Sequence, residues 1–254
     1  FSLIIASMNY IEHVGKYFSM LKQVLRKPQK WTVFRESLFR EIQDLGLSSI
    51  GIVAFISFFV GGVVVIQTAL NLENPLIPKY LIGFASRESL ILEFSPTLLS
   101  IILAGKVGSF ISSSIGTMRV TEQIDALEVM GVNSLNYLVL PKIIAAVLFY
   151  PFLIIISIFL GILGGYVAGN ITNLVLSSDY ISGIRYQFDP FHVTYSLIKT
   201  AVFAFVIATI PSYHGYYVKG GAIEVGRSST RAVVWTSVVI IFLNYILTQL
   251  LLGK

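Results

Sequence analysis

Ionisable side chains within or beside long apolar runs are the residues of this chain that could do chemistry. Glu93 has apolar neighbours on both sides and follows Arg87 and Glu88, and Lys106 interrupts a run that is otherwise uncharged. An ionised group at the centre of a bilayer costs about 3 kcal/mol, so it usually has a partner or a function. Glu93 and Lys106 could therefore couple transport to an ion. Alternatively, Glu93 pairs with Arg87 at the membrane surface, and Lys106 extends its ammonium to the head groups.

The residue types that catalysis or metal binding requires do not cluster. The chain has no cysteine, and its histidines (His13, His192 and His214) lie in three separate segments. No serine sits in a Gly-x-Ser-x-Gly elbow. The one stretch similar to a phosphate-binding loop has Ser100 and Val107 where that motif needs Gly and Ser or Thr. We therefore expect no catalytic residue, metal site or cofactor in this chain. If transport through this protein uses ATP, the ATPase that binds ATP and Mg²⁺ is another chain.

The composition indicates a membrane protein. Of the 254 residues, 55% are hydrophobic and only 12% are charged, whereas a soluble domain carries about 25% charged residues. A polar surface cannot be built from so few charges, and the uncharged runs are long enough to cross a bilayer. We predict an all-α polytopic protein with five transmembrane helices. The predicted spans are residues 47–70, 94–116, 143–169, 193–213 and 232–253.

The basic residues predict the orientation of these spans. With an odd number of spans, the termini lie on opposite sides of the membrane. A cytoplasmic N-terminus places thirteen of the 18 basic residues inside and five outside, which satisfies the positive-inside rule. We therefore expect a cytoplasmic N-terminus and a C-terminus on the other side.

Residues 1–45 form a basic segment that differs from the five-span part of the chain, residues 46–254. Apolar residues recur at helical spacing from Ile11 to Leu25 and from Trp31 to Leu45, with Pro28 between the two stripes. Such basic amphipathic stripes are typical of helices that lie in the membrane interface with lysines toward anionic head groups. Two packed soluble helices are the alternative.

The segment after the second span predicts a short cytoplasmic helix over residues 121–130. Thr121 is a suitable N-cap and Gly131 a suitable C-terminal stop. One row of this helix is acidic and the next is apolar. An anionic lipid surface would repel such a helix, so its apolar row is expected to contact protein. It is either a solvated connector docked on its own chain or a docking helix for a cytoplasmic subunit.

Glycines in two spans predict close helix packing. Gly161, Gly165 and Gly169 stack at intervals of four residues in the third span, and Gly61-Gly62 lies within the first. Small residues at this spacing let another helix approach closely. The ridge could serve packing within one subunit or a seam between two subunits.

Several of these segments together are similar to a known family. The stretches Leu92-Glu-Phe-Ser-Pro, Thr121-Glu-Gln-Ile-Asp-Ala-Leu, Met130-Gly and Leu138-Val-Leu-Pro resemble MlaE/YrbE-type permeases, the membrane subunits of ABC lipid transporters in Mla and Mce systems. The similarity is sharpest over residues 92–142. Ser95 stands where the family usually has glycine.

The resemblance implies a function, partners and site residues. It implies a homodimer in the cell inner membrane that moves phospholipid between this membrane and a periplasmic MCE-domain protein, contributing to outer-membrane lipid homeostasis. By position, Glu93 and Gln67 would contact the lipid substrate. A secondary transporter or channel that uses intramembrane charges is the alternative function. The residues that would couple the permease to a cytoplasmic ATPase are Thr121, Glu122, Gln123, Ile124, Asp125, Leu127 and Met130.

Overall fold

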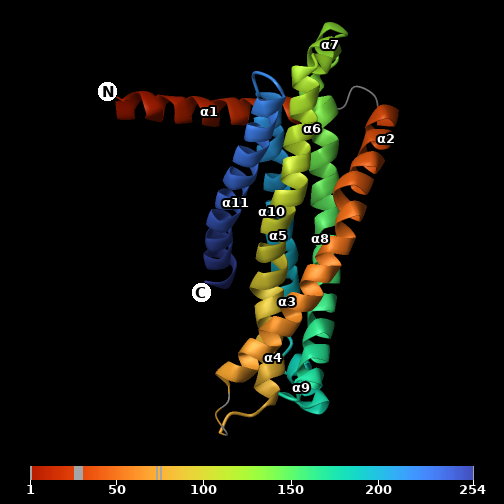
Figure 1. Ribbon diagram of the computed structural model, residues 1–254, viewed down its shortest axis with the longest axis vertical. Helices are drawn as coiled ribbons and strands as arrows, with labels where there is room; N and C mark the ends of the chain where they lie inside the picture. Colours follow the sequence, from red (N-terminus) through yellow and green to blue (C-terminus); the bar gives the residue numbers. More distant parts are fainter. Residues whose placement is uncertain (1, 26–30, 73, 75, 254) are drawn as a thin grey trace. The chain divides into compact units, whose positions relative to one another are not determined.

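The computed structural model describes residues 2–25, 31–72, 74 and 76–253, and in this part of the chain every regular element is a helix (Figure 1). Five helical segments are long and apolar enough to cross a membrane. The predicted all-α class and the five spans are therefore confirmed. The five segments cover Trp31–Asn71, Tyr80–Val120, Ser134–Ile171, Pro190–Tyr216 and Ala222–Leu252.

The helices extend beyond the predicted spans because polar flanking residues continue them. The second span does not begin near Phe94 but at Tyr80, and it consists of several consecutive segments. These are α4 (Tyr80–Ser89), the π-helix η3 (Leu90–Leu98), α5 (Leu99–Leu103), the π-helix η4 (Ala104–Gly108) and α6 (Ser109–Val120). The third, fourth and fifth spans are single helices, namely α8 (Ser134–Ile171), α10 (Pro190–Tyr216) and α11 (Ala222–Leu252).

The N-terminal segment forms helices, but the second one is not separate from the first span. Helix α1 covers Ser2–Val24 and α2 covers Trp31–Glu41. The predicted break at Pro28 lies outside the described residues. After α2 the chain stays helical through η1 (Ile42–Gly46), a π-helix, and η2 (Leu47–Ser49), a 3₁₀ turn, into α3 (Ile50–Asn71). The amphipathic stripe from Trp31 is therefore the first part of a helical run of 41 residues.

The chain divides into two compact units, and several helices contribute to both. Unit 1 consists of residues 1–45, 104–146 and 205–238; unit 2 consists of residues 46–103, 147–204 and 239–254. This division differs from the one predicted at residue 45, because the N-terminal helices belong to a larger unit. In unit 1, α1 contacts α10 through His13 Nδ1 and the Tyr213 hydroxyl, which are 2.7 Å apart.

Unit 2 has a closely packed contact between α3 and α8. A Cβ added to Gly61 would overlap the carbonyl of Gly161, and one added to Gly164 would overlap the carbonyl of Phe58. The glycine ridge of α8 therefore packs within one subunit. Without a hydrophobic driving force in lipid, such close van der Waals contact is a main source of helix association.

The same unit holds α4 against α9 (Ser177–Arg185), again through glycines. A Cβ at Gly83 would approach the carbonyl of Tyr180 to 2.5 Å, and one at Gly183 would overlap the carbonyl of Tyr80. Tyr180 is buried and its hydroxyl donates to the carbonyl of Ile162, 3.0 Å away. Burial raises the pKa of the Tyr180 hydroxyl above its ordinary value.

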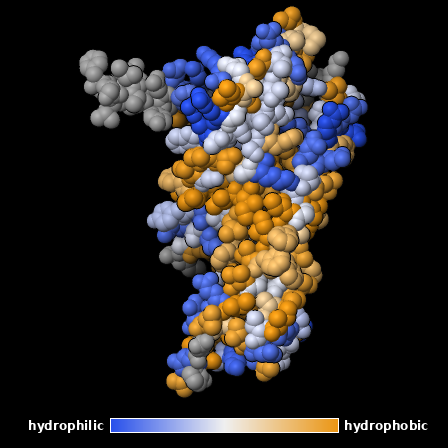
Figure 2. All heavy atoms as spheres, viewed as in Figure 1, coloured by the Kyte–Doolittle hydropathy of each residue, from blue (hydrophilic) through white to orange (hydrophobic). Residues whose placement is uncertain are grey.

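Hydrophobic side chains are also abundant on the outside of the molecule. Figure 2 shows them gathered over much of the visible face. Many large apolar residues of the spans are exposed, for example Phe55, Phe59, Phe159 and Phe242. Hydrocarbon is the solvent for such a surface, in agreement with a polytopic membrane protein.

The glycine contact gives a testable prediction. Gly61→Ala should destabilise the protein by about 1–3 kcal/mol, because the new methyl group would strike backbone that cannot move like a side chain. Gly51→Ala is the matched control: it lies in the same helix with nothing within 4 Å of the added Cβ. Thermal unfolding in detergent measures both. Equal stability of the two variants would contradict the close packing of α3 on α8.

Candidate functional site

A buried ammonium group lies at the centre of the strongest polar cluster in unit 2. Lys199 of α10 has 0% of its side chain exposed. Its Nζ donates to Glu93 Oε1 at 2.9 Å, to the Tyr195 hydroxyl at 2.8 Å and to the carbonyl of Leu92 at 3.1 Å. Three acceptors match the three protons of an ammonium group. The buried charge is therefore neutralised and hydrogen-bonded, as a charge in a membrane must be.

Pro96 explains why the Leu92 carbonyl can accept this bond. In an α-helix that carbonyl would bond to the backbone N–H of residue 96, and proline has none. Proline inside a helix disrupts the ladder, and residues 90–98 are indeed a π-helix. The sequence Leu92-Glu93-Phe-Ser-Pro96 thus presents a carboxylate and a carbonyl oxygen to the same lysine.

The second oxygen of Glu93 connects the cluster to α11. Glu93 Oε2 accepts from Asn244 Nδ2 at 3.1 Å, and the Thr97 hydroxyl lies 3.1 Å from the same oxygen and 2.9 Å from Asn244 Oδ1. The Glu93 side chain is still 44% exposed. We call Leu92, Glu93, Thr97, Tyr195, Lys199, Asn244 and Thr248 the charged network. It joins η3, α10 and α11 and leaves a carboxylate accessible.

Glu93 does not pair with Arg87, so that alternative is wrong. Arg87 is buried and pairs with Glu88. Its Nη1 donates to the carbonyls of Ile184 at 2.6 Å and Tyr186 at 2.9 Å. These carbonyls belong to the end of α9, where helical partners are missing. The other oxygen of Glu88 lies 2.7 Å from His192 Nδ1. This cluster holds α9 and the start of α10 in place.

Two other predicted residues lie elsewhere. Gln67 is exposed on α3, and no hydrogen bond or ion pair joins it to Glu93 in the described part of the chain. Lys106 belongs to η4 in unit 1. The cation that meets Glu93 is Lys199, which lies near the start of the predicted fourth span, residues 193–213, and was not among the predicted site residues. The sequence contained one signal for this site: Lys199 and Asn244 are polar residues within otherwise apolar predicted spans.

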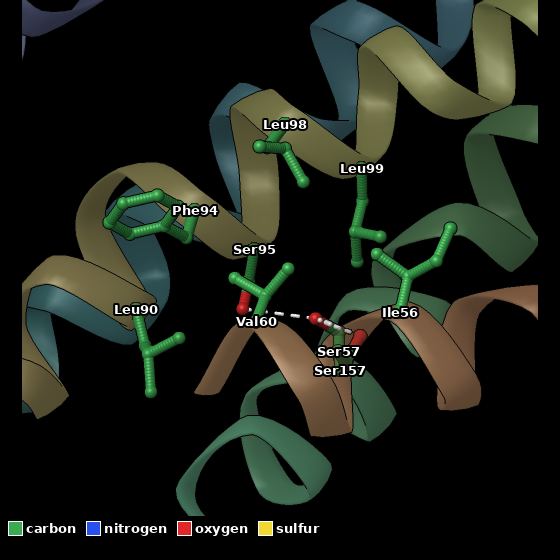
Figure 3. Close-up of a pocket in the computed structure, with 9 residues that line it drawn as sticks. All are labelled: Ile56, Ser57, Val60, Leu90, Phe94, Ser95, Leu98, Leu99 and Ser157. Carbon is green, nitrogen blue, oxygen red and sulfur yellow. Dashed lines mark hydrogen bonds between the residues drawn. The ribbon is translucent and has the colours of Figure 1, made fainter. Parts of the chain in front are cut away.

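A small cavity in unit 2 is lined by apolar residues and three serines (Figure 3). Ser57 of α3, Ser157 of α8 and Ser95 of η3 point toward one another; adjacent hydroxyls in this row are 3.0 Å apart. No charged side chain lines this cavity. The serines bond three helices together, which accounts for Ser95 where the resemblance predicted glycine.

The short helix predicted after the second span exists, but it is shorter than predicted at its start. Helix α7 covers Gln123–Val129. Thr121 is not its N-cap: its hydroxyl donates to the carbonyl of Thr117 at 2.8 Å. The N-cap is Glu122, whose φ of 60° lies in the left-handed region and whose side chain makes no capping bond. The expected stop is confirmed. Gly131 has φ 75° and its N–H donates to the carbonyl of Glu128.

The apolar row predicted on this helix does not form one exposed face. Ile124 is 0% exposed and packs inside unit 1, and Leu127 is half-buried. The exposed apolar residues are instead Val129 at 89% and Met130 at 67%. Val129 was not among the predicted coupling residues. The sequence indicates it only by its position next to Met130, just before the Gly131 that ends the helix.

Polar contacts hold α7 against neighbouring helices of unit 1. Asp125 accepts from Arg119 Nη1 of α6 at 2.7 Å. Glu128 Oε1 accepts from the Tyr216 hydroxyl of α10 at 2.8 Å and from the Ser134 hydroxyl of α8 at 2.9 Å. These bonds, first from Tyr216 and then from Ser134, lower the pKa of the Glu128 carboxyl below its ordinary value. Glu128 is therefore held as an acceptor.

The fold and these sites define a class before any comparison. The described residues contain no group of three or more His, Asp or Glu that could hold a metal ion. An all-α chain with five apolar helices long enough to cross a membrane, and with a charged network between helices, is a polytopic membrane protein.

Comparisons with known proteins give the particular family. The profile described as Permease MlaE matches residues 38–250, so the chain belongs to the MlaE permease family. It is 35% identical over 243 residues to a probable ABC transporter permease protein of Rickettsia bellii, covering 94% of this chain and 92% of that protein. A probable ABC transporter permease protein of Synechocystis is 32% identical over 234 residues, covering 92% and 89%. The intermembrane phospholipid transport system permease protein MlaE of Haemophilus influenzae is 29% identical over 259 residues, covering 97% and 98%.

The charged network predicts a specific pattern of stability. Glu93→Ala should destabilise the protein by about 3–5 kcal/mol, because it leaves the Lys199 ammonium buried without its counter-ion. The double variant Glu93→Ala with Lys199→Met should recover most of that loss. Thermal unfolding in detergent measures the two singles and the double. Additive losses would contradict a direct pairing of Glu93 with Lys199.

Proposed function

We propose that this chain is the permease subunit of an ATP-driven ABC transporter that moves phospholipid between the inner membrane and a periplasmic MCE-type partner. In this role it contributes to outer-membrane lipid homeostasis. The observation that carries the proposal is the match to the phospholipid permease of Haemophilus influenzae over 97% of this chain. The structure adds a polar site among apolar helices, which an amphiphilic substrate requires.

The charged network supplies the chemistry that a phospholipid head group needs. Lys199 and Asn244 are hydrogen-bond donors that could serve a phosphate, and both contact Glu93. A phosphate that replaced the Glu93 carboxylate would keep the Lys199 charge neutralised. Because Glu93 is 44% exposed, such an exchange would begin from an accessible carboxylate. Gln67, exposed on α3, is proposed to line the same substrate path.

Energy would come from a separate ATPase that binds ATP and Mg²⁺. The sequence contains no complete phosphate-binding loop. The proposed docking residues are Val129 and Met130, which are exposed, together with the exposed polar residues Glu122 and Gln123. An apolar anchor with a polar rim is typical of protein interfaces.

A second copy of the chain and a periplasmic MCE-domain protein complete the proposed assembly. Helix α11 is the least buried of the five spans, with 11% of its most apolar window buried. A span with so much exposed apolar surface is suited to a subunit contact, which supports the proposed homodimer.

A secondary transporter or channel remains the second candidate function. The observation that favours it is the ion pair of Glu93 with the buried Lys199 in unit 2, because charged groups among apolar helices occur on ion pathways. It predicts phospholipid-independent transport driven by an ion gradient, without ATP.

The docking proposal is tested with Val129→Arg. A charge in the apolar anchor should abolish co-purification of the ATPase and ATP-driven transfer of fluorescent phosphatidylglycerol in proteoliposomes, because burying an unpaired charge at an interface is costly. Ile223→Arg is the control, since Ile223 is a similarly exposed aliphatic residue of unit 1 outside α7. If Val129→Arg binds the ATPase and transports like the unmodified protein, α7 is only a connector. Transport by an ion gradient alone would favour the second candidate function.

The proposed orientation is tested with single cysteines, since the chain has none. Ser178 is exposed in α9, and Gly226 of α11 has open space for a side chain. In intact spheroplasts, a membrane-impermeant maleimide should label Ser178→Cys and not Gly226→Cys. The reverse pattern would place the N-terminus outside.

A further inference from the structure

Three polar groups from three helices meet at α7 in unit 1. Glu128 Oε1 lies 2.9 Å from Ser134 Oγ and 2.8 Å from the Tyr216 hydroxyl, and the two hydroxyls are 2.9 Å apart. Ser134 is the first residue of α8 and Tyr216 is the last residue of α10. We call Glu128, Ser134 and Tyr216 the α7 clamp. One carboxylate oxygen thus joins α7 to the ends of two membrane-spanning helices.

The number of protons makes Glu128 the key member of the clamp. Ser134 and Tyr216 each have one hydroxyl proton, and an ionised carboxylate only accepts. Ser134 and Tyr216 are buried residues, 2% and 8% exposed, whereas Glu128 is exposed. A buried hydroxyl without an acceptor is costly. Removing the carboxylate would leave the two hydroxyls with only each other, so one proton would lose its acceptor.

Further contacts hold the same side of α7. Arg119 pairs with Asp125, and its guanidinium lies 5.7 Å from the centre of the Tyr216 ring. Ile124 is fully buried. At its C-terminal end, Val129 and Met130 are exposed. Helix α7 therefore has contacts that fix it to its own unit and exposed apolar residues at its end that are available to a partner.

The connections at both ends of α7 would not fix it by themselves. It has only seven residues, and it is preceded by Glu122 in the left-handed region and followed by Gly131, also with a positive φ. A helix of this length between two turns is not stable by propensity alone. Its orientation depends on side-chain contacts.

We propose that Glu128 is a positioning residue that locks α7 to the start of α8 and the end of α10, so that a displacement of α7 is passed to these helices. The role rests on the proposed function, in which an ATPase pushes on α7. Glu128 would act through Ser134 and Tyr216 and not by contact with substrate. Without it, the turns at Glu122 and Gly131 would absorb the displacement.

Four variants distinguish the effect of losing the clamp contacts from the effect of losing a negative charge. Glu128→Ala removes the acceptor, whereas Glu128→Gln keeps a carbonyl oxygen at the same place. Ser134→Ala combined with Tyr216→Phe removes both donors and keeps the carboxylate. Glu36→Ala is the matched control, because Glu36 is an exposed acid of unit 1 for which the described residues show no polar contact.

Two measurements test the proposal. Hydrogen exchange of the permease alone should be several-fold faster in the amides of α7 for Glu128→Ala and for the double variant, and unchanged for Glu36→Ala. In the complex with its ATPase, the amount of fluorescent phosphatidylglycerol moved per ATP hydrolysed should fall several-fold in the same variants. The ATPase should still co-purify with them, and Glu128→Gln should retain most of the coupling.

The outcomes distinguish failure of this proposal from failure of the proposed function. If α7 exchange in Glu128→Ala equals that of the unmodified protein, the clamp is wrong whatever the function. If exchange rises but the lipid moved per ATP is unchanged, Glu128 is structural only and its coupling role is overturned. If the unmodified complex shows no ATP-driven lipid transfer, the proposed function fails and the coupling role fails with it, while exchange still decides whether the clamp exists.

Discussion

The structure of the polar site depends on how one ammonium group, that of Lys199, is accommodated among apolar helices. A lone buried ammonium costs several kcal/mol, so its protons need acceptors with good geometry. Glu93, Tyr195 and the Leu92 carbonyl supply them. One of these acceptors depends on Pro96, which lacks the N–H that would otherwise bond to Leu92. The π-helix η3, its proline and the position of Glu93 therefore act together: they supply the acceptors that make burial of the Lys199 ammonium possible.

The hydrogen bonds of Lys199 require that the helices of unit 2 keep their positions within a fraction of an ångström. Hydrophobic burial cannot hold them, since lipid is as apolar as the side chains. The direct contact of Gly61 with Gly161 and the serine row of Ser57, Ser157 and Ser95 provide close packing and directional bonds instead. Both features involve α3 and α8, and the serine row also fixes η3, the segment that carries Glu93.

The sequence predicts the features that follow from local composition. The apolar spans, the glycine ridge of α8 and the helix end at Gly131 are each determined by residues close together in the sequence, so they could be predicted from it. The pairing of Glu93 with Lys199 could not, because Lys199 is 106 residues away and its place in an apolar helix does not indicate which helix it meets. The N-terminus of α7 was misassigned because the Thr121 hydroxyl can bond either forward, as a cap, or back to Thr117, and the structure has the second arrangement. The prediction separated α2 from α3 at a change from amphipathic to apolar sequence. Such a change does not require a break, and the helix continues through it.

The two polar clusters follow the same physical logic. In each, a carboxylate from one segment satisfies donors on helices distant in sequence, Lys199 and Asn244 for Glu93, and Ser134 and Tyr216 for Glu128. Such contacts are directional and can be exchanged for another anion or acceptor, whereas a purely apolar contact of equal strength would be indifferent to charge. Helix α10 contributes Lys199 to the first cluster and Tyr216 to the second, and Pro211 lies between these two residues in the sequence. Each cluster lies within one unit, that of Glu93 in unit 2 and that of Glu128 in unit 1, so in each unit directional polar contacts fix the segment that carries the carboxylate.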